Sequence, residues 1–207
     1  EMTSSLVGSE MCIRDRVNII GLWMQQEIRR NFAAEGREYT FPQLAELAAK
    51  EKPLQSFIRP DDFMQPGDYP TKIREYCKQT GQPVPQTDGA LVRCILESLA
   101  LKYKQTYLSL KPYITWEEKL YIVGGGVQNE LLNQYTANAL GIPVITGASE
   151  ATAVGNVMAQ FKALGCYDTA QQKCDILAAS FDTKMYLPQE QEAWQEAYGK
   201  FEQLMED

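Results

Sequence analysis

Three consecutive glycines, Gly124, Gly125 and Gly126, follow a short apolar run at Tyr121–Val123 and precede a helical pattern at Leu131–Leu140. The apolar run suits a buried strand that ends at the glycines. Because glycine has no Cβ, the backbone there can turn sharply and a ligand can approach it closely. A helix that starts after such a turn directs unpaired N–H groups toward the same space, which suits a phosphate group. The pattern therefore indicates nucleotide binding at the turn.

The glycine run also fits a simpler interpretation, a tight strand-to-helix turn with no ligand. It is not Gly-x-Gly-x-x-Gly, and no Gly-Lys-Ser/Thr follows, so the dinucleotide fingerprint and the P-loop are both absent. Gln128 and Asn129 come directly after the glycines. Their side-chain amides would either hydrogen-bond a nucleotide or cap the following helix.

Composition limits the classes of function. The chain of 207 residues has a net charge of −7 and no histidine, which excludes histidine-based catalysis and histidine metal sites within it. The negative charge argues against a nucleic-acid interface, which needs a basic face. No apolar run approaches the roughly 20 residues of a membrane helix, and no secretory leader is visible. We therefore expect a cytoplasmic protein without nucleic-acid or membrane partners.

The five cysteines are widely spaced, and no Cys-x-x-Cys occurs; they lie at positions 12, 77, 94, 166 and 174. This spacing argues against a zinc site and is typical of a reduced, cytosolic protein. Cys77 and Cys94 lie on neighbouring predicted helices, and we expect both to be buried thiols. We predict no protein-held metal site.

The first 16 residues show neither an amphipathic period nor a helix-cap pattern. Ser5 to Arg16 resembles a translated sequencing adapter, so Glu1–Arg16 is expected to be a non-native tail. A disordered native tail is the alternative. On the first interpretation the native protein enters at about Val17 and lacks whatever preceded it. In both cases we expect residues 17–207 to carry the function.

Apolar residues recur at helical spacing through most of the chain. The first helix is expected at Asn18–Glu35, capped by Asn18, with a core-facing stripe of Ile19, Trp23, Met24, Ile28 and Phe32. Further helices are expected from the Thr40 cap to about Lys50, at Pro70–Thr80, and from Thr87 or Asp88 to about Leu110, with a brief strand at Phe57–Ile58.

The second half mixes strands and helices. Tyr121–Val123 and Ile142–Ile145 are expected to be neighbouring parallel strands, and Gly141 ends the helix between them. Ser149 is expected to cap the next helix, with Val154, Val157, Met158, Phe161 and Leu164 on one side. A helix at Gln171–Ser180, a weak strand or irregular segment at Phe181–Leu187 and a last helix from Pro188, with Trp194, Tyr198, Phe201 and Met205 as its apolar stripe, complete the chain.

Residues Ile122 to Gln134 resemble a motif of the FGGY carbohydrate kinases, in which the glycine triplet leads into Gln-Asn-x-Leu-Leu-Asn-Gln, and most strongly that of the rhamnulokinase group. Three other segments agree in order and spacing: Asn18–Trp23 with Gln26, Arg93–Ala100 and Glu150–Asn156. The resemblance extends from about Val17 to the C terminus. Several separated motifs in the right order are far more specific than any one of them.

The resemblance implies an α/β fold, the C-terminal part of an actin-like, ribonuclease-H-like ATPase domain, helix-rich and with a short, mostly parallel sheet that exposes one edge. In this family ATP and the sugar lie in the cleft between two such domains. The γ-phosphoryl group of Mg-ATP passes to a sugar hydroxyl. For the rhamnulokinase group the acceptor is L-rhamnulose, the product is L-rhamnulose 1-phosphate, and the pathway is L-rhamnose catabolism.

The resemblance also assigns site residues. The family's ATP-contacting glycine falls on Gly125 and its ATP-contacting glutamine on Gln26. Gly124, Gly126 and Asn129 share the ATP-binding motif. The substrate-binding asparagine falls on Asn18.

The catalytic aspartate of such kinases is expected upstream of the residue at Asn18, together with most of the sugar contacts. We therefore predict no catalytic residue in this chain and little or no turnover by it alone. Two alternatives stay open: another FGGY kinase of the fuculokinase or xylulokinase type, and a non-catalytic actin-like module that only holds nucleotide. The expected oligomeric state is a monomer or a weak homodimer.

Overall fold

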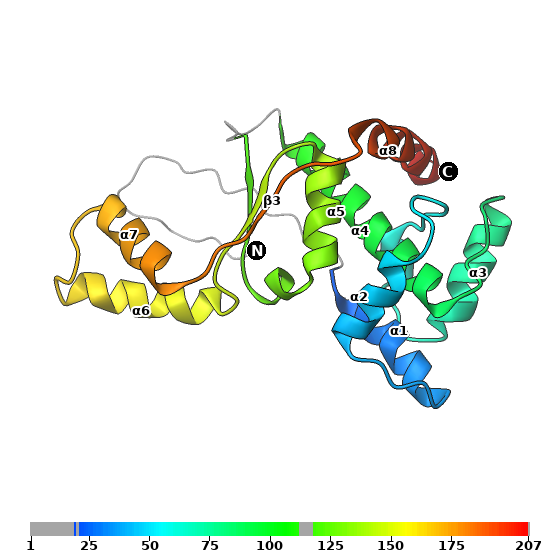
Figure 1. Ribbon diagram of the computed structural model, residues 1–207, viewed down its shortest axis with the longest axis horizontal. Coiled ribbons are helices and arrows are strands. Elements are labelled where there is room, and N and C mark those ends of the chain that lie inside the picture. The colour runs from blue at the N-terminus through cyan, green and yellow to red at the C-terminus, as the bar shows by residue number, and fades with distance from the viewer. Residues whose placement is uncertain (1–18, 20, 112–117, 207) are drawn as a thin grey trace, which may run out of the picture.

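A computed structural model describes residue 19, residues 21–111 and residues 118–206. The predicted adapter-like tail Glu1–Arg16 and Asn18 lie outside these residues. The described chain forms a helical body, a small sheet beside it and a pair of helices at the end remote from the body (Figure 1). Within the described ranges, no helix is long and apolar enough to span a membrane.

Helix α1 spans Trp23–Ala34 and buries Met24, Ile28 and Phe32, as their spacing predicts. Two expectations for this helix were wrong. It begins at Trp23 after Leu22, which supplies no side-chain cap, and not at Asn18. Trp23 is 40% exposed rather than part of the core. Helical side chains lean toward the N-terminus, so the first residue projects past the end of the helix.

Helices α2 (Phe41–Ala49) and α3 (Tyr69–Gln79) begin at side-chain caps; the Thr40 cap of α2 was predicted, whereas the Asp68 cap of α3 was not. Thr40 Oγ1 accepts from the Gln43 N–H at 3.4 Å, and Gln43 Oε1 accepts from the Thr40 N–H at 2.8 Å, which completes a capping box. The Asp68 carboxylate accepts from the Thr71 N–H at 3.1 Å. Hydrogen bonds from the Thr71 side chain and from its N–H lower the pKa of Asp68.

The strand predicted at Phe57–Ile58 is absent, and a 3-10 helix η1 at Pro60–Phe63 follows that segment. Side chains take the place of a partner strand. The Phe57 N–H donates to Gln82 Oε1 at 2.7 Å, and the Ile58 N–H donates to Ser98 Oγ at 2.9 Å. Because these contacts satisfy the buried backbone donors, the segment needs no ladder.

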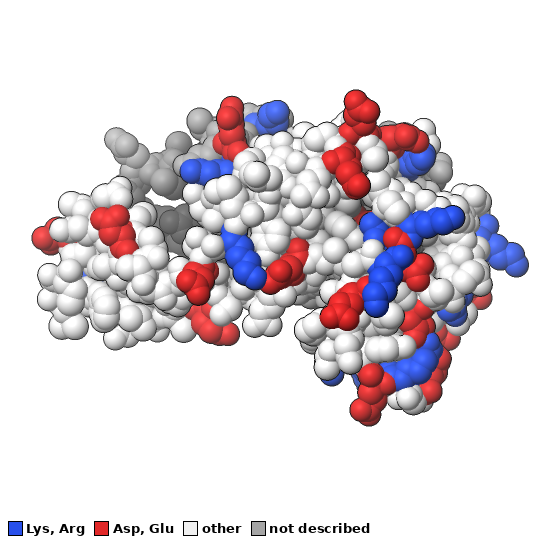
Figure 2. Space-filling model, in the orientation of Figure 1, with Lys and Arg blue, Asp and Glu red and all other residues white. Residues whose placement is uncertain are grey.

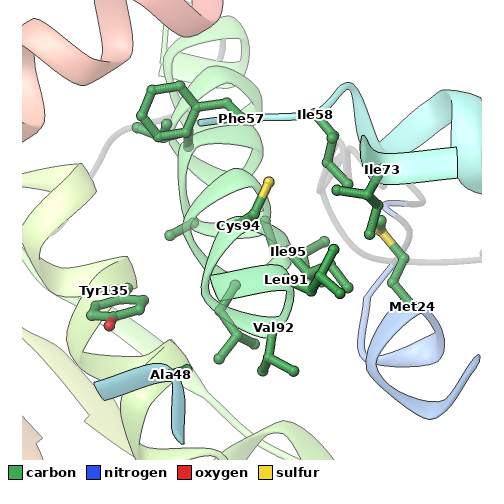
Figure 3. Packing of buried hydrophobic residues seen from close by; sticks show 14 of the residues in the cluster. Met24, Ala48, Phe57, Ile58, Ile73, Leu91, Val92, Cys94, Ile95 and Tyr135 are labelled. Carbon is green, nitrogen blue, oxygen red and sulfur yellow. The ribbon is translucent and has the colours of Figure 1, made fainter. Parts of the chain in front are cut away.

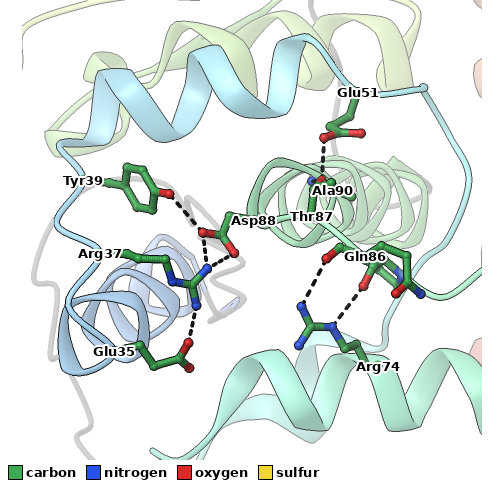
Figure 4. Close-up of polar contacts among 10 residues, drawn as sticks. Glu35, Arg37, Tyr39, Glu51, Arg74, Gln86, Thr87, Asp88 and Ala90 are labelled. Carbon is green, nitrogen blue, oxygen red and sulfur yellow. Dashed lines mark hydrogen bonds and ion pairs between the residues drawn. The ribbon is translucent and has the colours of Figure 1, made fainter.

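Helix α4 (Asp88–Leu110) runs through the centre of the helical body (Figure 1). Thr87 is its N-cap and accepts from the Ala90 N–H at 3.0 Å. Asp88, in the first turn, binds Arg37 and accepts from the Tyr39 hydroxyl, so the start of α4 is tied to the loop between α1 and α2 (Figure 4). A negative charge at this end also suits the helix dipole.

The sheet has three short strands in the order β1 (Leu120–Ile122), β2 (Val144–Thr146) and β3 (Met185–Tyr186). Strands β1 and β2 are parallel, as predicted, and Leu120 pairs with Val144. Between them lie the 3-10 helix η3 (Gly125–Gln128) and helix α5 (Glu130–Leu140), which ends at Gly141 with φ +73°. Strand β3 pairs antiparallel with β2, so the sheet is mixed rather than mostly parallel.

Helices α6 (Ala151–Ala163) and α7 (Ala170–Ser180) form the remote pair (Figure 1). Ser149 does not cap α6, because the N-cap is Glu150 without a side-chain hydrogen bond. Of the predicted apolar side of α6, only Met158 is buried, while Val157, Phe161 and Leu164 are exposed. Most of this side of the helix is therefore open to solvent in the described chain.

The last helix, α8 (Gln191–Glu206), starts three residues after the predicted Pro188 and buries Trp194, Tyr198 and Phe201 as expected. These side chains join one hydrophobic cluster that extends across α1, α2, α3, α4, α5 and α8 (Figure 3). Cys77 and Cys94 lie in the same cluster as free, buried thiols, as predicted. A continuous apolar cluster of this kind holds the helices in fixed positions.

Candidate functional site

The glycine run forms the turn that leads from β1 toward α5. Gly124 has φ +82°, a conformation that favours glycine, and its N–H donates to the Ala148 carbonyl at 2.9 Å. The Gly147 N–H donates to the Ile122 carbonyl at 2.8 Å, which anchors the end of β1. The turn is therefore built by backbone contacts that require glycine at position 124.

Gly125 borders open space. A Cβ at this position would meet no atom within 4 Å, whereas one at Gly126 would lie 3.6 Å from the Ile122 side chain. The N–H groups of Gly125 and Gly126 have no acceptor among the described residues. A bare backbone with unpaired N–H groups can accept a close polar or anionic ligand.

A cavity of about 580 Å³ lies between α1, α2 and the segment from η3 into α5. It brings together Gln26 and Gly125, which the family resemblance assigned to ATP from distant parts of the sequence. Gln128 and Asn129 line it as well, whereas Gly124 and Gly126 do not. Asn18, the predicted substrate-binding residue, lies outside the described residues.

The cavity wall is apolar on the side of α1 and α2 and polar near the glycine turn. Leu22, Phe41, Pro42 and Leu131 supply apolar surface. Amide side chains, including Gln26, supply donors and acceptors. Flat apolar surface beside a few amide groups is the usual lining of a site for a planar, polar ring.

Asn129 caps α5, one of the two roles that the sequence left open, and its contact with ATP stays a prediction. Its Oδ1 accepts from the Leu132 N–H at 3.0 Å as the N-cap of α5, and its Nδ2 donates to Gln25 Oε1 at 3.0 Å. Asn133, which is buried, donates to the Val127 carbonyl at 3.1 Å and holds η3 against α5. These contacts give the polar wall of the cavity a defined shape.

Gln25 is the residue that the sequence interpretation missed. It lines the cavity, is only 2% exposed, and its Nε2 has no acceptor among the described residues. A signal was present in the sequence, because Gln25 stands three and seven positions before the buried Ile28 and Phe32. A polar residue on the apolar face of a helix needs a partner.

The cavity has acidic but no basic side chains in its lining. Glu46 and Glu130 contribute carboxylates, and no Lys or Arg of the described residues lines it. Glu130 is paired with Lys184, and that contact raises the pKa of Lys184. On the face drawn in Figure 2, Lys and Arg are interspersed with Asp and Glu rather than gathered in one patch. A phosphate here would depend on backbone N–H groups or on a metal ion.

A second cavity, of about 270 Å³, lies near the loop between α3 and α4 and includes Arg93 and Glu97. Arg93 donates to Glu97 Oε1 at 2.7 Å and to the Ala48 and Glu51 carbonyls at 3.0 Å. Glu97 accepts from the Leu54 N–H. Burial raises the pKa of Glu97 to about 7, although Arg93 and the Leu54 N–H oppose this effect. These groups are already paired, and they join α4 to the end of α2.

Comparison with known proteins places this geometry in a family. The family model described as "FGGY family of carbohydrate kinases, C-terminal domain" matches residues 1–164. The chain belongs to the FGGY family of carbohydrate kinases. The turn at Gly125 and the cavity beside it are therefore features of an FGGY C-terminal domain. Among the described residues, no group of three or more Cys, Asp or Glu side chains could hold a metal ion.

Curated FGGY relatives extend well beyond the length of this chain. It is 44% identical over 197 residues to a rhamnulokinase of Bacteroides thetaiotaomicron, an alignment that covers 94% of the chain and 40% of the relative. A rhamnulokinase of Bacillus subtilis is 37% identical over 189 residues, covering 88% of the chain and 38% of the relative. The chain thus spans about 40% of the length of the first of these relatives.

Solved structures of FGGY kinases share the fold. A xylulose kinase from Rhodospirillum rubrum superposes on this chain with a TM-score of 0.65 at 20% sequence identity. The superposition covers 88% of this chain and 37% of the xylulose kinase chain. Plasmodium falciparum glycerol kinase with ADP gives a TM-score of 0.63 at 13% sequence identity. This superposition covers 88% of this chain and 36% of the glycerol kinase chain. The helix-rich architecture with its small sheet is therefore the actin-like fold of these kinases.

Proposed function

We propose that this chain is the nucleotide-binding part of an ATP-dependent sugar kinase that converts L-rhamnulose and Mg-ATP into L-rhamnulose 1-phosphate and ADP. The observation that carries the proposal is the cavity in which Gln26 and Gly125 meet, since the family resemblance assigned both to ATP. The choice of sugar is supported by the printed names of the curated relatives, which are rhamnulokinases.

The size and lining of the cavity support a nucleotide as its ligand. A volume of about 580 Å³ lies within the range of ordinary ligand pockets. The apolar surface of Leu22, Phe41 and Pro42 suits the faces of a base. The open backbone at Gly125 gives the phosphates a place to approach without a side chain in the way.

Phosphoryl transfer needs positioning, a metal ion and a base for the attacking hydroxyl. In the proposed reaction the sugar hydroxyl oxygen bonds to the γ-phosphorus, the bond from that phosphorus to the β,γ-bridging oxygen breaks, and the hydroxyl proton passes to a base. We assign this chain, over residues 17–207, the task of holding and orienting the nucleotide. We place the aspartate base and most sugar contacts in a part of the protein outside it.

A binding experiment tests the nucleotide half of the proposal. Mg-ATP at 100 times its Kd should raise the free energy of unfolding of this chain by about 2.7 kcal/mol. Thermal melting and titration calorimetry would measure the effect, with Mg²⁺ alone as the control. Absence of both a melting shift and a binding signal at millimolar Mg-ATP would contradict nucleotide binding.

A chimera tests the sugar kinase half. This chain would replace the matching segment of the Bacteroides thetaiotaomicron relative, with which it shares 44% identity. We expect the chimera to phosphorylate L-rhamnulose in preference to L-fuculose and D-xylulose, and this chain alone to show no turnover. A preference for another sugar would favour a different FGGY kinase. A folded, ATP-binding chimera without activity would favour a non-catalytic nucleotide-binding module.

We also propose that the protein acts in the cytoplasm as a monomer or weak homodimer. The free thiols of Cys166 and Cys174, both exposed, support a reducing compartment. Sedimentation of this chain at several concentrations tests the oligomeric state, and a stable dimer at nanomolar concentration would contradict it.

A further inference from the structure

We propose that Gln25 determines nucleobase recognition by donating a hydrogen bond from its Nε2 to a ring nitrogen of the adenine of bound ATP. The inference rests on the proposed function, because it names the group that reads the nucleotide in the same cavity. Neither the glycine motif nor the family resemblance assigns a role to Gln25.

The orientation of the Gln25 amide follows from a chain of contacts. The Leu132 N–H can only donate, so Asn129 must present its Oδ1 to it, at 3.0 Å. The Nδ2 of Asn129 is then the donor that faces Gln25, at 3.0 Å, and Gln25 must present Oε1. The Nε2 of Gln25 is left as the free end of the amide. The start of α5 therefore fixes which group Gln25 offers to a ligand.

The free end is buried and has no partner. Gln25 is 2% exposed, and its Nε2 finds no acceptor among the described residues. An unpaired buried donor is costly, and native proteins retain few of them. A leucine at this position would complete the apolar face formed with Ile28 and Phe32. A ligand acceptor in the cavity would satisfy the donor and explain why the polar side chain stands there.

The side-chain lining of the cavity suits a neutral ring acceptor as the partner of Gln25, whereas the phosphates are assigned to the open backbone at Gly125. No Lys or Arg of the described residues lines the cavity, and the Glu46 carboxylate adds negative charge that would repel a phosphate placed beside it, whereas Glu130 is paired with Lys184. Leu22 and Phe41 provide apolar surface for a planar ring. A neutral amide N–H matches the lone pair of a purine ring nitrogen in this environment.

The experiment combines a near-isosteric substitution with ATP analogues that each lack one ring acceptor. Gln25→Glu keeps an oxygen for the Nδ2 of Asn129 and removes the Nε2 donor. Calorimetry would compare ATP with 1-deaza-, 3-deaza- and 7-deaza-ATP on the unaltered chain and on Gln25→Glu. Gln25→Met is the uncharged second variant, and Gln203→Glu, an exposed position outside the cavity, is the matched control for the added charge.

The unaltered chain and Gln203→Glu should bind one of the three analogues about tenfold more weakly than ATP. Gln25→Glu and Gln25→Met should bind ATP at least tenfold more weakly and should no longer distinguish it from that analogue. A purely structural role would weaken ATP and the analogue equally, so discrimination that persists in both Gln25 variants would overturn the inference. Unchanged ATP affinity in both variants would also overturn it. Failure of the unaltered chain to bind ATP would instead remove the proposed function itself.

Discussion

Two neighbouring glycines of the turn serve different purposes. Gly124 adopts φ +82°, where a Cβ causes backbone strain, while Gly125 has ordinary backbone angles and open space where its Cβ would be. The first glycine is therefore required by the fold. Gly125 instead leaves space for a ligand to approach the backbone.

Alanine at each of these glycines should separate the two purposes. Gly124→Ala should lower the free energy of unfolding by about 1–2 kcal/mol, since alanine is strained at positive φ. Gly125→Ala should leave stability within about 0.5 kcal/mol but weaken ATP binding, because the new methyl group occupies the open space. Urea denaturation and calorimetry measure both effects. Equal stability losses at the two positions would contradict the assignment.

Glu97 gives the protein a pH-dependent stability. Burial raises its pKa to about 7, from an ordinary value of 4.5. The charge of Arg93 lowers this pKa, and the charge of Glu190 raises it. Because the folded state holds the proton more tightly, the contribution of this group is complete below about pH 4.5 and is lost as pH rises through 7. The expected decrease in unfolding free energy is on the order of 3 kcal/mol.

Glu97→Gln should flatten this part of the pH profile, since an amide does not titrate. Denaturant unfolding at several pH values between 4.5 and 7.5 measures the slope. Glu75→Gln, on the exposed side of α3, is the control and should keep the slope of the unaltered chain. An identical slope in Glu97→Gln would show that another group controls the titration.

Helix α4 approaches α2 closely at one glycine. A Cβ at Gly89 would lie 2.6 Å from the Leu47 carbonyl oxygen, a contact that alanine cannot make without moving the α2 backbone. Gly199 in α8 has no atom within 4 Å of its Cβ position. The two helical glycines therefore differ in packing.

Gly89→Ala should destabilise the chain by about 1–3 kcal/mol because of overpacking. Gly199→Ala should stabilise it by up to about 1 kcal/mol, because alanine has the higher helix propensity. Chemical denaturation measures both changes in the free energy of unfolding. A decrease for Gly89→Ala and an increase for Gly199→Ala would establish the close approach of α2 and α4. A stabilising Gly89→Ala would mean that the two helices are further apart.

The starts of α2 and α4 were predictable because their side-chain caps are local. Thr40 and Thr87 each accept an N–H from three residues ahead, a contact that involves no other part of the chain. The prediction was wrong at Phe57–Ile58, where Gln82 and other distant side chains replace the expected strand pairing. Such contacts depend on tertiary packing and leave no local pattern.

The molecule as a whole divides into a well-buried helical body and a thinly packed end. Helix α4 buries twelve of its residues, whereas α6 buries Met158 alone and α7 buries none. Local stability follows the amount of apolar surface that a segment buries. The helical body and the α6–α7 pair should therefore open with different free energies.

Native-state hydrogen exchange should show this difference. Amides of α4 should exchange only through global unfolding, and those of α6 and α7 should exchange at least a hundredfold faster through local opening. Adding Mg-ATP should slow exchange around η3 and the start of α5 first, because they line the cavity. Protection of α7 equal to that of α4 would contradict the description.

The sequence by itself determined the helices with local caps, the parallel pair of strands, the glycine turn between them and the FGGY motif. Each depends on residues within a few positions of one another, so the pattern is visible without the fold. Only the tertiary structure decided that Trp23 is exposed, that Gln25 is buried with a free donor, and that Gln26 meets Gly125 across one cavity. These outcomes depend on which faces of α1, α2 and α5 pack together, a property of the assembled core rather than of any segment.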